Sequence, residues 1–447
     1  MSEPIVSTEP VTTPLPRRAK KTDKEKDVPK VANVAAGIIA MMKKRATSSV
    51  YTLGDMAKHT WGIEIPDLAL QWLIGHSSIV PCQRYFRVSG MPKSLKSTFM
   101  IYLGGLYVQQ GGVLVYCDNE GKTSASMLDA MTWWWLKPEQ RDSLIPQITT
   151  SAEQWMTIVT DIGKGARDPD GDYHGNAKGQ RIPILIVIDS LMGREGEDAQ
   201  ELLQKEGSVE VRGYATLAGQ ITRFLDRFTM AGTTLSMGYV QHMKPGIDGN
   251  MHEKGAVQAG FSSSVGIRVT KFQTPVSYAS HALFTDVKPD AKGKTPEVTG
   301  FELLMATDMS CLGPDKNKLV VEVLWQHVPV IDPVTGLSDG TTRQVMKYDW
   351  AGALGRLLHG FKYDDKAKLY EYELNRLNET LYFVQGKSSK TVKCEALGLE
   401  NATFTEFGLA IQADPVTYTK VQNFLNIKRY DSVQQADIDW SAGSMAK

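Results

Sequence analysis

The sequence predicts an α/β fold with a mostly parallel, twisted sheet flanked by helices, preceded by an N-terminal helix and followed by a small α-rich C-terminal domain. A Lys- and Ser-containing turn, Gly90–Ser97, joins a short apolar strand from Tyr85 to a helix that ends near Gln110. Further along, the unbroken aliphatic run Ile184–Ile188 is typical of a central parallel strand that is buried on both faces.

The composition is that of a globular protein without net charge. The chain has 447 residues, of which 42% are hydrophobic and 22% charged, and this suits two or three domains with a sizeable core. Its 50 Lys and Arg balance its 50 Asp and Glu, so any binding to nucleic acid must be local. The four cysteines are scattered without a Cys-x-x-Cys pair, which indicates reduced thiols rather than a zinc site or a redox couple.

Membrane insertion and secretion are not expected. The longest apolar runs, Val31–Met42 and Ile182–Ile188, fall short of the roughly 18 residues that a membrane span needs. The polar, Pro-rich N-terminus does not resemble a secretion signal. We therefore expect an intracellular, cytoplasmic protein with no membrane partner.

Two segments precede the predicted core. Residues 1–29 combine five prolines with basic residues, which predicts a disordered basic tail. A solvated tail is favoured over one that binds DNA or a partner, because acidic residues are interleaved. From Val31 to Met42, apolar residues form one stripe of an amphipathic helix. The residues alone favour packing of this helix on its own core over packing on a neighbouring subunit.

The turn Gly90–Ser97 has the residues that a phosphate-binding loop needs. Such a loop offers backbone N–H groups at a helix N-terminus, a Lys for the β and γ phosphates and a hydroxyl for Mg²⁺. Lys96 and Ser97 can supply the Lys and the hydroxyl, and the other candidate contacts to the nucleotide are Gly90, Lys93, Ser94 and Thr98. The usual pattern has Gly before the Lys, where this chain has Leu95, so the motif alone is equally compatible with an ordinary polar turn.

Two predicted strands end in carboxylates. The strand Val113–Cys117 leads into Asp118-Asn119-Glu120, and open α/β sheets bind ligands at such strand ends. Glu120 is the candidate general base, although an exposed acid at a helix start is the commoner role for such a residue. Asp189 follows the aliphatic run, where the Mg²⁺ ligand of a nucleotide site is expected. Together with the turn, these strands favour a nucleotide-hydrolysing core.

Two long polar, Gly-containing segments, 195–213 and 243–264, lie among the later elements and are predicted to be mobile loops. The first precedes a predicted helix that contains Leu217 and Phe228, and the second follows a predicted strand, Leu235–Val240. Segments of this kind can bind a phosphodiester backbone without reading bases, and an active-site lid is the alternative. The candidate DNA contacts are Arg212, Lys244, Gly246, Lys254, Gly255 and Ser263.

Other features of the sequence carry less functional information. Asp168–Asp172 resembles the start of a calcium loop, but Tyr173 stands where Gly is required, so a turn is predicted. Trp133–Trp135 would point in three directions from a helix, which favours packing over a stacking surface. Further strands are predicted at Val265–Phe272, Phe301–Thr307 and Leu319–Trp325.

Taken together, these residues resemble the RecA/RadA recombinase family, and most closely its UvsX-type phage branch. The likeness covers about two thirds of the chain, from Val50 to Asp349. Members of the phage branch also tolerate a bulky residue at the position of Leu95. The matching motifs are Val50–Asp55 after the N-terminal helix, Asp118–Glu120 as the Asp-x-Glu, Ile188–Leu191 as the Walker B strand, Gln241-His242 as the γ-phosphate sensor and Ile331–Leu337 as a phage-branch signature.

The resemblance implies a RecA-like P-loop ATPase core and a DNA recombinase that requires ATP and Mg²⁺. Its implied catalytic residues are Glu120, Lys96 and His242, Gln241 would contact the nucleotide, and Ser97 and Asp189 would hold Mg²⁺. The two polar segments would bind DNA, and the helix from Val31 would dock on the next subunit of a helical filament, which reverses the preference for self-packing. The implied domains are a tail at 1–29, an oligomerisation helix at 30–50, a core at 51–350 and a C-terminal domain at 351–447.

The implied partners are single- and double-stranded DNA, further copies of the chain, and single-strand-binding and loader proteins. One departure concerns the subunit boundary: phage relatives carry Glu-Lys-Ser-Arg where this chain has Asp308–Cys311. Lys271, Lys316 and Lys318 are the candidate cations in its place. Two alternatives are a ring-shaped DNA helicase with the same core and a DNA-coating filament protein whose ATP hydrolysis is vestigial.

Overall fold

The computed structural model describes residues 62–132, 135–167, 182–191, 211–228, 233–245, 251–253, 263–271, 282–284, 298–331, 338–363 and 371–428. The predicted tail, the helix from Val31, the calcium-like segment and most of the first polar segment lie outside these residues. So do the residues 332–337 of the phage-branch signature.

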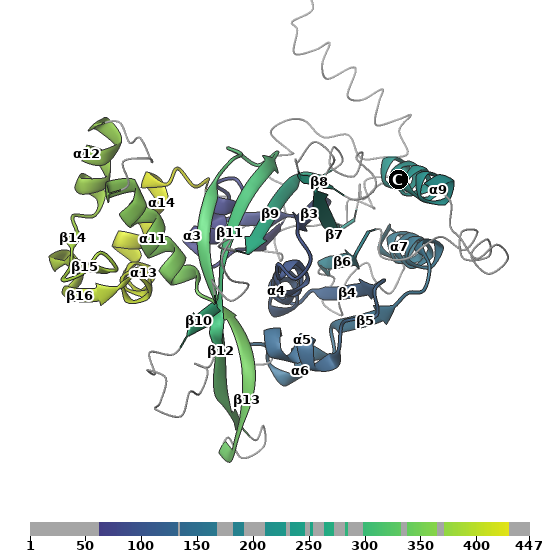
Figure 1. Ribbon diagram of the computed structural model, residues 1–447, viewed down its shortest axis with the longest axis horizontal. Helices are drawn as coiled ribbons and strands as arrows, with labels where there is room; N and C mark the ends of the chain where they lie inside the picture. Colours follow the sequence, from purple (N-terminus) through teal and green to yellow (C-terminus); the bar gives the residue numbers. More distant parts are fainter. Residues whose placement is uncertain are drawn as a thin grey trace, which may run out of the picture. The chain divides into compact units, whose positions relative to one another are not determined.

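A large, mostly parallel sheet flanked by helices forms the centre of this α/β fold, as predicted (Figure 1). Its parallel part has the strand order β9-β3-β7-β6-β4-β5. These strands are β3 (Tyr85–Gly90), β4 (Val113–Asp118), β5 (Leu144–Ile148), β6 (Ile184–Asp189), β7 (Leu235–Pro245) and β9 (Val265–Lys271).

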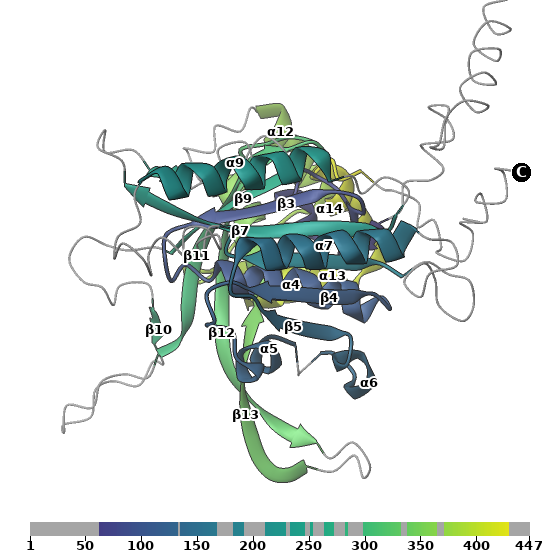
Figure 2. The same cartoon turned by 90° about the vertical axis from the view of Figure 1, so that its right-hand side faces the viewer.

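Helices cover both faces of the parallel strands because successive side chains of a strand point to opposite faces. On one face, Leu185 and Val187 of β6 pack in the same cluster as the buried side of α4 (Lys96–Gln109). On the other face, Ile184, Ile186 and Ile188 pack against α7 (Ala152–Arg167) and α9 (Val211–Arg227), which lie side by side (Figure 2). Every residue of β6 is buried, as its aliphatic sequence predicts.

Antiparallel strands extend the sheet beyond β9. The predicted strands Phe301–Thr307 and Leu319–Trp325 are parts of the longer β11 (Val298–Ser310) and β12 (Lys318–Ile331). They are joined by β13 (Ser338–Tyr348) and β10 (Ala282–Phe284), neither of which the sequence pattern predicts. β12 and β13 pair in antiparallel register as a hairpin. Arg343 of β13 pairs with Asp129 at 3.2 Å and so connects this hairpin to α5 (Ala125–Thr132).

The polar segment that begins at Met243 is partly a hairpin, which corrects the prediction of a loop. β7 continues to Pro245 and pairs in antiparallel register with β8 (Met251–Glu253). The Gly-rich residues between the two strands fit a connection of this kind. The residues of this hairpin lack the alternation of apolar and polar residues that predicts a strand, so the sequence pattern does not reveal it.

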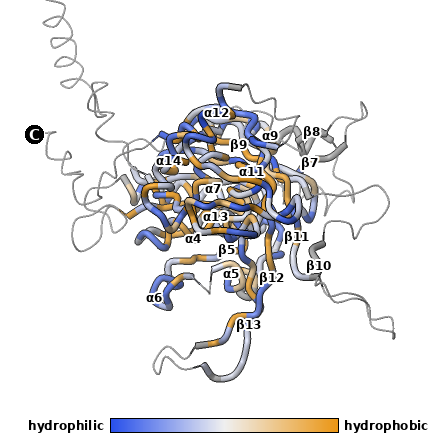
Figure 3. Tube along the Cα trace, turned by 90° about the vertical axis from the view of Figure 1, so that its left-hand side faces the viewer, coloured by the Kyte–Doolittle hydropathy of each residue, from blue (hydrophilic) through white to orange (hydrophobic). Residues whose placement is uncertain are grey.

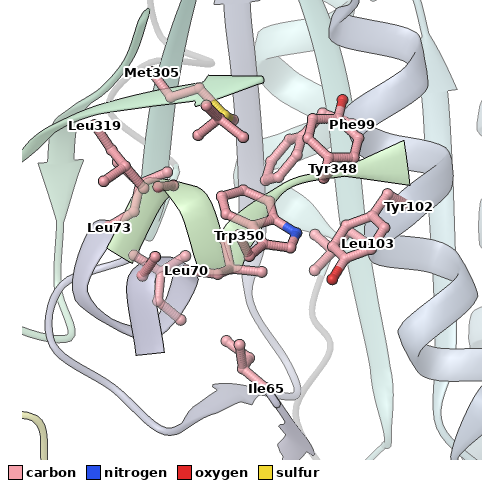
Figure 4. Close-up of a cluster of buried hydrophobic side chains, with 14 of the residues drawn as sticks. Ile65, Leu70, Leu73, Phe99, Tyr102, Leu103, Met305, Leu319, Tyr348 and Trp350 are labelled. Carbon is pink, nitrogen blue, oxygen red and sulfur yellow. The ribbon is translucent and has the colours of Figure 1, made fainter. Parts of the chain in front are cut away.

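The elements after β13 pack against the start of the described chain. Trp350 of α11 (Trp350–Tyr363) stacks on Tyr348, and its ring also lies near Phe99 and Tyr102 of α4 (Figure 4). In addition, α11 packs on α3 (Leu68–Leu73). The predicted C-terminal helices are present together with a three-stranded sheet; these elements are α12 (Glu371–Thr380), α13 (Phe404–Ala413), α14 (Pro415–Phe424), β14 (Val384–Gln385), β15 (Thr391–Cys394) and β16 (Leu399–Thr403).

Short elements complete the described chain: β1 (Gly62–Glu64), β2 (Ile79–Pro81), α6 (Pro138–Arg141) and the 3-10 helix η2 (Glu395–Leu397). Figure 3 shows that α6 and α12 are mainly hydrophilic, whereas hydrophobic residues are frequent in the central elements. Trp135 packs on Tyr102, in agreement with the predicted packing role of the tryptophans. Within the described ranges, no helix combines the length and the apolar character that crossing a membrane would require.

Candidate functional site

The predicted phosphate-binding turn lies between β3 and α4. Lys93 (φ 63°) and Leu95 (φ 62°) adopt left-handed backbone conformations on either side of Ser94. Left-handed residues that alternate with right-handed ones turn successive N–H groups toward one side and form anion-binding concavities. The backbone of Leu95 also explains why the usual pattern has Gly here, since a left-handed conformation costs a residue with a Cβ roughly 1–2 kcal/mol.

Gly90 begins this turn, and no larger residue fits there. Its φ is 159°, and a Cβ would lie 2.2 Å from the carbonyl oxygen of Val269 and 2.8 Å from Ser94 Oγ. The hydroxyl of Ser94 is itself buried and has no hydrogen-bond partner within the described structure. A backbone that is closely packed on one side, with an unbonded hydroxyl beside it, fits a bound oxyanion.

Lys96 is the first residue of α4, and it is buried. Its ammonium donates a hydrogen bond to the Met91 carbonyl at 2.7 Å across the turn. Burial lowers the pKa of Lys96 to about 8, an effect that Asp189 and Glu120 oppose. Desolvation disfavours an ammonium without a close anion, so Lys96 is suited to bind an anion at the helix N-terminus.

Asp118 organises the segment that follows β4. One of its carboxylate oxygens accepts hydrogen bonds from the backbone N–H groups of Glu120 (2.9 Å) and Gly121 (2.8 Å), and the other accepts one from Thr123 (2.6 Å). These three bonds hold the backbone of residues 120–123 against the end of the strand. The position of Glu120 therefore follows from the carboxylate two residues before it.

Glu120 has partners on both carboxylate oxygens. His242 Nε2 donates to Oε1 at 2.6 Å, Ser190 Oγ donates to the same oxygen at 2.9 Å, and the Lys122 ammonium pairs with Oε2. The hydrogen bond from His242 is the main reason that the pKa of Glu120 lies well below its usual range, and Lys122 and Ser190 contribute further. Glu120 is therefore held as a carboxylate.

Asp189 lies beside this segment because β4 and β6 are parallel neighbours, with Asp118 opposite Asp189 in the register. The hydroxyl of Tyr116 donates a hydrogen bond to Asp189 Oδ2. Burial raises the pKa of Asp189, while hydrogen bonds from Ser97 and Tyr116 act in the opposite direction. A buried carboxylate next to the Ser97 hydroxyl is suited to hold a cation.

The strand β7 brings Gln241 and His242 to the same edge of the sheet. It lies between β3 and β6, and its register places Gln241 opposite Ser89 and His242 opposite Gly90. Gln241 is buried, and the ring of His242 reaches Glu120. The structure thus brings together the predicted residues Lys96, Ser97, Glu120, Asp189, Gln241 and His242.

No protein-only metal cage accompanies these residues in the described ranges, where no group of three or more His, Cys, Asp or Glu could hold a metal ion. Mg²⁺ usually keeps several waters and binds through one or two protein oxygens together with phosphate oxygens of a nucleotide. Ser97 and Asp189 fit this kind of site.

Three of the six predicted DNA contacts, Arg212, Lys244 and Ser263, lie among the described residues. Arg212 lies on α9 and Lys244 on β7, whereas Gly246, Lys254 and Gly255 lie outside the described residues. Ser263 is buried, and its hydroxyl contacts Met309 Sδ at 3.6 Å. Its placement therefore offers no exposed contact for DNA.

The segment Asp308–Cys311, which departs from the phage pattern, contacts its own chain. Asp308 pairs with Arg87 at 2.8 Å and lies 3.7 Å from Arg268, and Ser310 Oγ donates to the Ile74 carbonyl at 2.9 Å. Its polar groups therefore connect β11 to β3, β9 and the end of α3.

Sequence reasoning missed Lys122, Tyr116, Ser190 and Asn119. Asn119 joins the ends of the two acidic strands, since its N–H donates to the Asp189 carbonyl at 2.7 Å and its side-chain amide donates to the Ser190 carbonyl at 2.8 Å. Lys122 could have been noticed from its position two residues after Glu120. The contact of Tyr116 depends on the pairing of β4 with β6, which no local pattern reveals.

No protein-family model matches the chain, and a search of curated proteins finds no significant match.

Proposed function

We propose that this protein is an ATP-dependent DNA recombinase, which forms helical filaments on single-stranded DNA and carries out homologous pairing and strand exchange. One observation carries the nucleotide part of the proposal. The buried Lys96 stands at the start of α4, close enough to Glu120 and Asp189 for their charges to raise its pKa against the effect of burial. A cation, a helix N-terminus and two carboxylates at one sheet edge are the parts that phosphoryl transfer requires.

In this proposal each residue has a role that its position supports. Lys96 and the backbone of the turn bind the phosphates, and Ser97 and Asp189 hold Mg²⁺. Glu120 accepts a proton from the attacking water. His242, on β7, senses the terminal phosphate and passes its presence to the segment that continues from this strand. Bound ATP supplies the phosphoanhydride bond that is broken.

The DNA and filament parts of the proposal are supported by the resemblance of the sequence to RecA/RadA recombinases. The hairpin of β7 and β8 continues directly from the strand that carries Gln241 and His242. A change at the phosphate sensor can therefore reach this hairpin through a single strand. In the proposal, ATP binding strengthens the filament on DNA and hydrolysis loosens it.

The proposal is tested by ATP turnover of the full chain with and without single-stranded DNA, followed by electron microscopy of the same mixture. We expect turnover that DNA stimulates, and helical filaments that form with ATP. The variant Lys96→Ala should lose both nucleotide binding and turnover. Lys164→Ala is the matched control, because Lys164 is an exposed lysine of α7 that pairs with Asp161.

Other outcomes separate the alternatives. Closed rings without helical filaments would identify a helicase and end the recombinase proposal. Filaments on DNA without measurable turnover would identify a coating protein with vestigial hydrolysis. Turnover that survives in Lys96→Ala would remove the turn from the mechanism.

A further inference from the structure

Lys122 reaches from solvent to the candidate general base. Its ammonium pairs with Glu120 Oε2, and its side chain is 75% exposed, whereas that of Glu120 is 17% exposed. An ordinary surface ion pair is the simplest account, and such pairs contribute roughly 0–1 kcal/mol to stability. Three further observations indicate a functional role.

First, the backbone that carries Lys122 is held in place while most of its side chain is exposed to solvent. Asp118 accepts hydrogen bonds from the N–H groups of Glu120, Gly121 and Thr123, which surround Lys122 in the chain. The Lys side chain is flexible, with three rotatable donors at its end. Lys122 can therefore change partner without any rearrangement of the strand end.

Second, the pair blocks the oxygen of Glu120 that could activate water. Oε1 is bonded by His242 and Ser190, and Lys122 pairs with Oε2. These contacts hold the pKa of Glu120 well below its usual range. Lys122 therefore has to leave Oε2 before this oxygen can accept a proton from water.

Third, Lys122 shares its electrostatic surroundings with Lys96. Both ammonium groups interact electrostatically with Glu120 and Asp189. Two ammonium groups that repel each other favour an anion near both of them.

We propose that Lys122 is a second phosphate-binding lysine, which pairs with Glu120 in the nucleotide-free protein and turns to the terminal phosphate when ATP binds. Its departure frees Glu120 Oε2 to accept the proton of the attacking water. The inference rests on the proposed nucleotide site and deepens it.

Equilibrium binding of a fluorescent non-hydrolysable ATP analogue and of fluorescent ADP tests this role with the full chain. We expect Lys122→Ala to weaken binding of the ATP analogue about tenfold or more, because a charge-assisted hydrogen bond to the terminal phosphate is lost. Binding of ADP, which lacks that phosphate, should change little. Lys122→Arg should retain the preference for the ATP analogue, and Lys164→Ala should behave as the wild type.

The outcomes distinguish this inference from the proposed function. If the wild type binds neither nucleotide, both fall together. If Lys96→Ala loses binding while Lys122→Ala binds the ATP analogue as the wild type does, the nucleotide site stands and Lys122 is an ordinary surface cation. Equal weakening of ADP and ATP-analogue binding would also overturn the inference, because it excludes a specific contact with the terminal phosphate.

Discussion

The ends of β4 and β6 are adjacent in the sheet, and each leads to a carboxylate. The pKa values of these two carboxylates are shifted in opposite directions. At the β4 end, His242 and Lys122 lower the pKa of Glu120. At the β6 end, burial raises the pKa of Asp189, and the nearby charge of Glu120 adds to this effect. Glu120 is hydrogen-bonded to His242 and paired with Lys122, whereas Asp189 is buried and accepts a hydrogen bond from Tyr116.

This difference indicates how two carboxylates at one sheet edge can have different tasks. A desolvated carboxylate beside a hydroxyl gains most from an incoming metal ion, because the ion removes an unfavourable buried charge. A carboxylate that is paired with a flexible lysine can instead be released when the lysine binds another anion. Environments that shift the pKa values of two neighbouring acids in opposite directions commonly mark different catalytic roles.

Removing the proton acceptor at the β4 end should have the largest effect. Glu120→Gln keeps the shape of the side chain but cannot take a proton, so turnover should fall about 10²- to 10⁴-fold. Binding of ATP and ATP-dependent binding of DNA should persist. Phosphate release and nucleotide binding measure the two properties, with Glu139→Gln, an exposed change on α6, as the control. Unchanged turnover would remove Glu120 from the mechanism.

Removing the charge of Asp189, at the β6 end, should weaken ATP binding as well as slow hydrolysis. Asp189→Asn should weaken Mg²⁺-dependent ATP binding about a hundredfold, which is the upper range for losing a group that supports a bound metal. The free protein should remain folded, because burial disfavours the charge that the change removes.

A magnesium titration of ATP binding measures this effect, and Asp161→Asn, an exposed change on α7, is the control. Without Mg²⁺, the wild type and Asp189→Asn should bind ATP equally weakly. A difference of the same size in the absence of the metal would show that Asp189 acts on the nucleotide by another route.

The sequence predicts that Glu120 and Asp189 lie at the ends of neighbouring strands, but it does not predict the difference between their surroundings. The turn at Lys96, the end of β4 and the end of β6 are recognisable because each is a local pattern of apolar strand and polar residues. Whether a carboxylate is paired or desolvated depends on residues from other strands. His242 approaches Glu120 from β7, and Tyr116 approaches Asp189 from β4.

The same reason explains where the predicted fold falls short. Buried strands such as β6 have continuous aliphatic sequences and are predicted with nearly correct bounds. In contrast, much of β13 is exposed and polar, so its sequence lacks the apolar alternation of a half-buried strand. Its existence follows from hydrogen bonding to β12, which a local pattern does not contain.

The smallest expected effect concerns the contribution of the hydrogen bond between His242 and Glu120 to the stability of the folded protein. Because the pKa of Glu120 is lowered in the folded protein, this stability is present above the ordinary carboxyl pKa near 4.5 and is lost as the pH falls through the folded value. His242→Gln should therefore lower the Tm at pH 7 by about 2 °C, which corresponds to roughly 1 kcal/mol. The difference from the wild type should shrink below pH 4. Thermal unfolding between pH 3 and 8 measures it, with the exposed His327→Gln as the control. A difference that stays constant over this range would show that His242 stabilises the fold by packing and not by holding the charge of Glu120.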